Sequence, residues 1–263
     1  MRPRLVLVLL VGGLLLAGCG GPVAWSVQPI RTPVEAWLAH SPSLIAHRGG
    51  SADWPEGTAY AYGRAAEWSP TLALEAPVWL TSDGVWVICH DATTGAEFDR
   101  DLDIATSTWA QLSVLRTVDR GLPMARLSDV LAEHPDRVWL VDDKPAADPA
   151  GLLDLLDAAG GPARFVVKSY GPSVAAPEAA RGRGYLTWGY WFTADLLTFD
   201  ADQVRYDLLA LPWDGPATAW ADAVATGKPV FGHVVSTPAQ ARQALAEGAT
   251  GLMVSGVTEV VPR

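Results

Sequence analysis

The stretch LIAHRGG, residues 44–50, joins a short apolar run to a histidine, an arginine and two glycines. The same order, an apolar run that ends at a charged or titratable side chain, returns at residues 71–75, 85–90, 138–142 and 165–168. Further apolar runs cover residues 185–188, 208–211, 230–234 and 252–254. Because several of these runs do not alternate with polar residues, they are typical of strands that are covered on both faces, as in a parallel sheet.

Segments rich in alanine and leucine lie between these runs and predict helices at residues 34–39, 58–67, 127–133, 149–159, 217–225 and 238–247. Strands that alternate with helices indicate βαβ units. The runs 71–75 and 85–90 have no helix between them and are joined through Ser82-Asp83-Gly84, and an Asp-Gly step is typical of a hairpin. If the hairpin is an insertion, eight strands remain. The predicted fold is therefore an α/β (β/α)8 TIM barrel with a β-hairpin insertion after strand 2.

Residues 1–18 predict a signal peptide, because Arg2 and Arg4 precede an apolar run that ends in small residues. That run has about a dozen residues, fewer than the roughly 20 that span a bilayer. Its ending, Leu16-Ala17-Gly18-Cys19, resembles the lipobox of bacterial lipoproteins, which implies cleavage before Cys19 and lipidation of its thiol. An uncleaved anchor helix and an ordinary signal peptide are the alternatives. We expect residues 19–43 to be a lipidated tether and lead-in, residues 44–263 to be the barrel, and the protein to be exported and held at the membrane outside the cytoplasm.

Composition limits the classes of partner. Hydrophobic residues make up 49% of the chain and charged residues 18%, which is enough apolar material for a real core. The formal net charge is −10, and it is more negative once Arg2 and Arg4 are removed. We expect no nucleic-acid partner, because a phosphate backbone needs a basic face. With Cys19 lipidated, Cys89 has no partner in the chain and is predicted to be a buried, inert thiol.

The active site of such a barrel lies at the carboxyl ends of its strands. Polar residues that follow the apolar runs should therefore meet at one mouth; they are His47, Arg48, Glu75, His90, Asp142, Lys144 and Lys168. Two histidines can act as paired general acid and base near neutral pH. Carboxylates hold hard divalent cations, and Arg and Lys neutralise phosphate oxygens. The set favours metal-assisted phosphodiester cleavage.

The motifs IAHRGG (45–50), PEGT (55–58), TSDG (81–84) and HD (90–91) follow one another in an order that resembles the glycerophosphodiester phosphodiesterases. The resemblance extends over about residues 44–256. It implies hydrolysis of small glycerophosphodiesters, or of phospholipid-derived substrates, to sn-glycerol 3-phosphate and an alcohol. It also implies roles for six residues: proton transfer at His47 and His90, phosphate binding at Arg48 and Lys144, and a divalent metal ion, Ca²⁺ or Mg²⁺, at Glu75 and Asp142.

Two departures from the family pattern concern the metal. The usual E-x-D of strand two reads Glu75-Ala76-Pro77, and proline cannot coordinate, so we expect a weakly held ion. The usual E-x-K reads Asp142-Asp143-Lys144. In the alternative interpretation, Glu75 is a buried partner of Arg48 or Lys144 and holds no metal ion. Lys144 and Asp142 then form a structural ion pair. The corresponding alternatives for the chain are a catalytically impaired barrel that binds phosphoglycerol groups, and a lyase that forms a cyclic phosphate.

Overall fold

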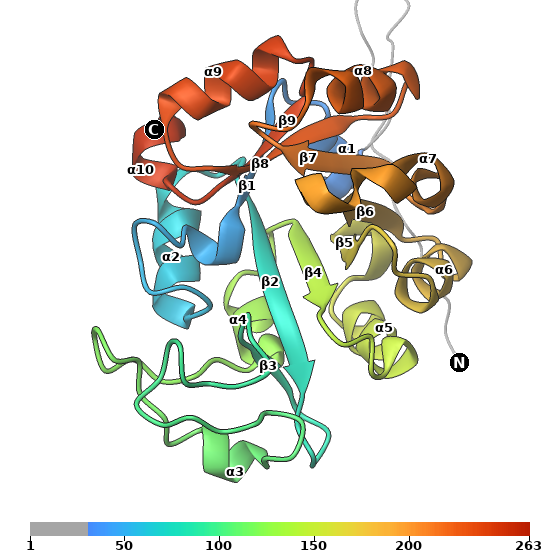
Figure 1. Cartoon of the computed structure of the whole chain (residues 1–263). Coiled ribbons are helices and arrows are strands. Elements are labelled where there is room, and N and C mark those ends of the chain that lie inside the picture. Colours follow the sequence, from blue (N-terminus) through green and yellow to red (C-terminus); the bar gives the residue numbers. More distant parts are fainter. Residues whose placement is uncertain (1–30) are drawn as a thin grey trace, which may run out of the picture. The chain divides into compact units, whose positions relative to one another are not determined.

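Eight parallel strands close on themselves in the computed structural model, which describes residues 31–263. They are β1 (Ser43–Ala46), β2 (Ala73–Leu80), β4 (Trp139–Asp143), β5 (Phe165–Tyr170), β6 (Leu186–Tyr190), β7 (Leu208–Pro212), β8 (Val230–Val235) and β9 (Gly251–Val254). The ring closes because β1 pairs with both β9 and β2 (Figure 1). The predicted TIM barrel is confirmed. The predicted signal peptide and Cys19 lie outside the described residues.

The predicted hairpin is confirmed as well. Strand β3 (Trp86–Ile88) pairs antiparallel with the last residues of β2, and Gly84 takes the positive φ of 81° in the turn between them. The insertion has a small core of its own, formed by Val87, Phe98, Ile104, Leu112 and Met124 among others. It includes α3 (Trp109–Leu112) and follows the carboxyl end of β2 (Figure 1). Cys89 is a free, buried thiol in this core, as expected.

Helices cover the outside of the barrel (Figure 1): α2 (Ala59–Trp68), α4 (Leu127–Glu133), α5 (Pro149–Ala158), α6 (Ala175–Gly182), α7 (Phe199–Asp202), α8 (Ala217–Ala225), α9 (Pro238–Ala246) and α10 (Val257–Val260). The sequence did not predict α3, α6, α7 and α10. Helix α1 (Pro33–Leu38) packs Val34 and Trp37 on the barrel interior, where Trp37 stacks on Phe231 at 5.7 Å. It therefore closes the end of the barrel at which the strands begin. No helix within residues 31–263 is both long and apolar enough to cross a membrane.

Alternation along each strand decides which side chains enter the barrel. On β4, Leu140 packs in the interior cluster, whereas Trp139 and Val141 pack in the layer between strands and helices. Asp142 therefore faces inward and Asp143 outward. The same parity turns Glu75 of β2 and Lys168 of β5 inward. The interior is apolar near the start of the strands and charged near their carboxyl ends, which is where a barrel places its chemistry.

A buried histidine makes the barrel sensitive to acid. His233 of β8 is buried, and its Nε2 lies 3.1 Å from the carbonyl oxygen of Trp191. Burial lowers its pKa to about 4. An unfolded histidine takes up a proton below about pH 6.5. The contribution of neutral His233 to the free energy of unfolding, up to about 3 kcal/mol, is thus lost as the pH falls from about 6.5 towards 4.

We expect His233→Gln to reduce the loss of stability in this pH range, because the variant lacks one of the histidines that take up a proton on unfolding there. Urea unfolding at pH 7 and pH 5, followed by tryptophan fluorescence, measures the difference. His40→Gln is the matched control, since His40 is exposed. An equal pH dependence in wild type and His233→Gln would contradict the assignment.

Candidate active site

The residues that follow β1 form a tight turn that presents a histidine and an arginine. Arg48 has the left-handed φ of 51° and Gly49 a φ of 83°. A Cβ on Gly49 would lie 3.0 Å from the Cβ of Ala61, so the turn needs glycine there. The backbone N–H of Arg48 donates to Glu75 Oε2 at 2.8 Å. The carboxylate of β2 thereby holds the strained turn of β1 in place.

Both predicted proton-transfer residues have a lowered pKa. Burial, followed by the charges of Arg48 and Lys168, holds the pKa of His47 well below its usual value. His47 Nδ1 lies 3.0 Å from Ser51 Oγ. The pKa of His90 is lowered by burial and by the charge of Arg48, against the opposing effect of Asp91, whose Oδ1 is 2.6 Å from His90 Nδ1. Both imidazoles are therefore neutral at pH 7 in the free site and can accept a proton.

Two cations reach the mouth of the barrel. The side chains of Arg48 and Lys144 are 19% and 17% exposed. Arg48 pairs with Glu56 at 2.7 Å, and Lys144 Nζ lies 3.4 Å from Asp142 Oδ2 and 3.3 Å from the hydroxyl of Tyr190. These partly exposed cations can bind the oxygens of a phosphate group. One small cavity is lined by Arg48, by His90 and by several other residues, so the cation and the second histidine face a common space.

A third cation lies below them, between the two predicted metal ligands. Lys168 Nζ is 3.1 Å from Glu75 Oε1 and 2.6 Å from Asp142 Oδ2. The side chains of Lys168, Glu75 and Asp142 are 7%, 1% and 2% exposed, and we call them the buried ion cluster. Burial lowers the pKa of Lys168, but the charges of Asp142 and Glu75 raise it above its usual value. Burial also opposes ionisation of Glu75, yet Lys168 and Arg48 keep its pKa lowered. Both shifts favour the charged forms of Lys168 and Glu75.

The sequence placed Lys168 at the mouth but gave it no role. Lys168 stands two residues after Val166 in the strand FVVKSY, and Val166 faces the barrel interior. This alternation is the signal that could have identified Lys168 as a site residue. Glu75 does have a buried cationic partner, but it is Lys168 rather than the side chain of Arg48 or Lys144. The alternative ion pair of Lys144 with Asp142 is present at 3.4 Å.

The residues in this arrangement do not fit a divalent metal ion. Three of the four carboxylate oxygens of Glu75 and Asp142 already lie against N–H donors. Pro77 lies beside Asp142 in the strand register and offers no ligand, while Asp143 faces away. A divalent ion about 4 Å from the ammonium of Lys168 would be repelled by about 8 kcal/mol at an effective dielectric constant of ~20. Within residues 31–263 no three His, Cys, Asp or Glu side chains form a metal-binding group.

The formal net charge of the buried ion cluster is nevertheless the one that the family's metal site would have. Three carboxylates around a divalent ion have a net charge of −1. The formal charges of two carboxylates and one ammonium, as in Glu75, Asp142 and Lys168, also sum to −1. The missing carboxylate at Pro77 and the added ammonium of Lys168 therefore leave this formal charge unchanged.

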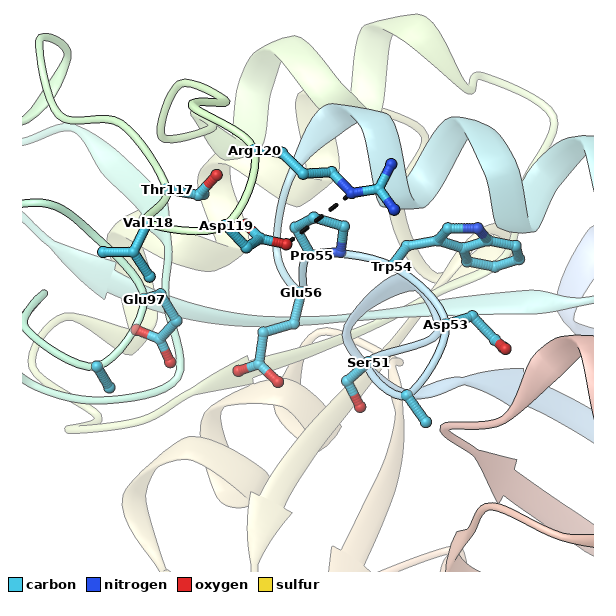
Figure 2. Close-up of a pocket in the computed structure, with 12 residues that line it drawn as sticks. Ser51, Asp53, Trp54, Pro55, Glu56, Glu97, Thr117, Val118, Asp119 and Arg120 are labelled. Atoms are coloured by element: carbon cyan, nitrogen blue, oxygen red, sulfur yellow. Dashed lines mark ion pairs between the residues drawn. The ribbon is translucent and has the colours of Figure 1, made fainter.

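A cleft of about 330 Å³ opens beside the site, between the loop after β1 and the insertion (Figure 2). Its lining includes Trp54, Glu56, Glu97, Asp119 and Arg120. Glu56 also pairs with Arg48, so the cleft adjoins the predicted phosphate-binding arginine. Burial and the charge of Glu56 raise the pKa of Glu97 to about 7. The cleft is acidic and includes the aromatic ring of Trp54.

Residues 47–148 match the model of the glycerophosphoryl diester phosphodiesterase family, and this stretch holds all six predicted site residues. This part of the chain is similar to the glycerophosphodiester phosphodiesterases. The resemblance found in the sequence is confirmed. The match ends just after Lys144, so the family signal lies in the first half of the barrel and the hairpin insertion.

Several solved structures have a similar fold over most of this chain. A putative glycerophosphoryl diester phosphodiesterase from Silicibacter pomeroyi is 20% identical, with a TM-score of 0.71 over 85% of this chain and 94% of that one. A phosphodiesterase from Oleispira antarctica, solved with the product sn-glycerol-3-phosphate, is 17% identical, with a TM-score of 0.69 over 81% and 92%. The Thermotoga maritima glycerophosphodiester phosphodiesterase is 19% identical, with a TM-score of 0.64 over 83% and 96%. At these identities the likeness concerns the fold.

Proposed function

We propose that this chain hydrolyses glycerophosphodiesters to sn-glycerol 3-phosphate and an alcohol. The observation that carries the proposal is the convergence of two neutral histidines, His47 and His90, with the partly exposed cations Arg48 and Lys144 at one barrel mouth. The match of residues 47–148 to the glycerophosphoryl diester phosphodiesterase family supports the same reaction. The product bound to the Oleispira antarctica phosphodiesterase agrees with it.

Arg48 and Lys144 bind the non-bridging phosphate oxygens and offset the negative charge that develops at phosphorus. One histidine takes a proton from water as the water oxygen forms its bond to phosphorus. The bond between phosphorus and the alcohol oxygen breaks, and the other histidine gives its proton to that oxygen. Both histidines are neutral in the free site, so one must gain a proton in the complex. The negative charge of the bound phosphodiester raises their pKa values and favours this.

The purified mature protein is expected to release sn-glycerol 3-phosphate from glycerophosphocholine or a related small diester. A coupled glycerol-3-phosphate dehydrogenase assay measures the rate, and phosphorus NMR identifies the product. His40→Ala, at an exposed position, should keep the wild-type rate. A cyclic phosphate as the final product would show the lyase instead, and a folded protein without turnover on any glycerophosphodiester would contradict the proposal.

A second candidate is a barrel that binds phosphoglycerol groups without cleaving them. The buried ion cluster favours it, because the carboxylates expected to hold a metal ion are bound to Lys168. This candidate predicts heat of binding with glycerophosphodiesters in a calorimeter and no product by NMR. Measurable turnover would exclude it.

We also propose that the protein is exported and is held at the outer face of the cell membrane by lipid on Cys19. The basic start, the apolar run and the Leu-Ala-Gly-Cys ending support this. Lipid chains anchor a protein by burying methylene groups in the bilayer. Metabolic labelling with a radioactive fatty acid tests the proposal, and labelling that persists in Cys19→Ser would contradict it.

A further inference from the structure

The two carboxylates at the centre of the mouth have a cation between them that belongs to the chain. Lys168 Nζ is within 3.1 Å of an oxygen of Glu75 and of Asp142. Its ammonium also lies 4.3 Å from the ring centre of Tyr190 and 5.7 Å from that of Trp188, and aromatic faces attract cations. All five side chains are buried. The ammonium is therefore enclosed by oxygens and aromatic faces, much as a bound ion would be.

We propose that the ammonium of Lys168 is the resident cation of this site and takes the place of a divalent metal ion between Glu75 and Asp142. The chain then binds phosphodiester anions and acts on them without metal. Metal-free turnover rests on the proposed function, whereas the exclusion of a metal ion from the site does not.

Strand register explains why Lys168 can take this position. Asp142 of β4 pairs directly with Lys168 of β5, and Pro77 of β2 pairs with Asp142 on its other side. A lysine in one neighbouring strand thus supplies the positive charge, and the residue in the other neighbouring strand supplies no carboxylate. Lys168 does not reach the rim of the mouth. It is a positioning residue that keeps Glu75 ionised, and the Glu75 carboxylate in turn accepts the N–H of Arg48 at 2.8 Å.

Calorimetric titration with CaCl₂ and MgCl₂ tests the inference on three forms of the mature protein. They are wild type, the double variant Pro77→Asp/Lys168→Gln, and the control Lys228→Gln, which changes a partly buried lysine bound to Gln203 outside the site. We expect no saturable binding to wild type or to the control. The double variant removes the ammonium and adds a carboxylate beside Asp142, so it should bind one ion per chain at least about tenfold more tightly.

Saturable binding of one ion per chain by wild type would overturn the inference. The wild-type titration needs no variant, so it decides the question even if the double variant fails to fold. Thermal melting gives a second readout, because an ion that binds the folded state raises the melting temperature. Wild type should melt at the same temperature with calcium and with a chelator.

The wild-type turnover assay, run with chelator and with added metal, separates this inference from the proposed function. Turnover that survives the chelator supports both. Turnover that appears only with added metal overturns the role of Lys168 and leaves hydrolysis in place. A protein that binds no metal and shows no turnover contradicts the hydrolysis and supports Lys168 as the resident cation.

Discussion

His47→Ala is expected to lower the rate of glycerophosphodiester hydrolysis by about 10³-fold, within the 10²–10⁴-fold range of a general acid or base. The imidazole is kept neutral by burial and by the charges of Arg48 and Lys168, which suits a group that accepts a proton from water. Its Nδ1 hydrogen bonds only to Ser51 Oγ among the described side chains, so the fold should survive the change. The rate of sn-glycerol 3-phosphate release measures the effect.

His90→Ala should lower the rate by a similar factor, because the two histidines act as acid and base in the same reaction. The double variant should lose little more than the slower single variant, since groups that act as a unit are not additive. His40→Ala controls for the loss of a histidine as such. If either single variant keeps more than about a tenth of the wild-type rate, that histidine does not transfer the proton.

The barrel could be predicted because its strands are covered on both faces and read as apolar runs. The prediction of β2 stopped at residue 75, whereas the strand continues to Leu80. Pro77 explains the difference, since a proline without an N–H argues against a central strand. In the structure Pro77 stays in register with β4, and its carbonyl oxygen accepts the N–H of Cys89 at 3.1 Å.

Helix α6 (Ala175–Gly182) could not be predicted for a related reason. Its sequence, AAPEAARG, contains a proline and ends in glycine, and both residues disfavour a helix interior. Pro177 lies in the first turn, where its missing N–H would have no partner within the helix. The boundary between loop and helix thus depends on where the turn begins, and residue propensities do not fix that point.

The candidate site was predictable residue by residue, but its pairing was not. Barrel geometry brings the residue after each strand to one mouth, so His47, His90 and Lys144 could be named in advance. Which carboxylate meets which cation depends on the stagger between neighbouring strands. Asp142 pairs with Lys168 because β4 and β5 align those two residues, and no spacing within the sequence encodes that alignment.

The largest loss of stability is expected from Glu75→Gln, which should lower the free energy of unfolding by about 3 kcal/mol at pH 7. The amide can still accept the N–H of Arg48, so the turn after β1 keeps its bond. The change removes one of the two negative charges that neutralise buried Lys168, and a buried charge left partly unpaired is costly. Urea unfolding followed by tryptophan fluorescence measures the loss.

Glu67→Gln is the matched control, because it removes the partner of Arg64 at an exposed surface pair and should cost less than about 1 kcal/mol. Adding Lys168→Met to Glu75→Gln removes the unpaired ammonium and leaves Asp142 paired with Lys144. We therefore expect the double variant to be more stable than the sum of the two single losses allows. Strict additivity would show that Glu75 and Lys168 do not interact, and the buried ion cluster would then not be the element that holds this mouth together.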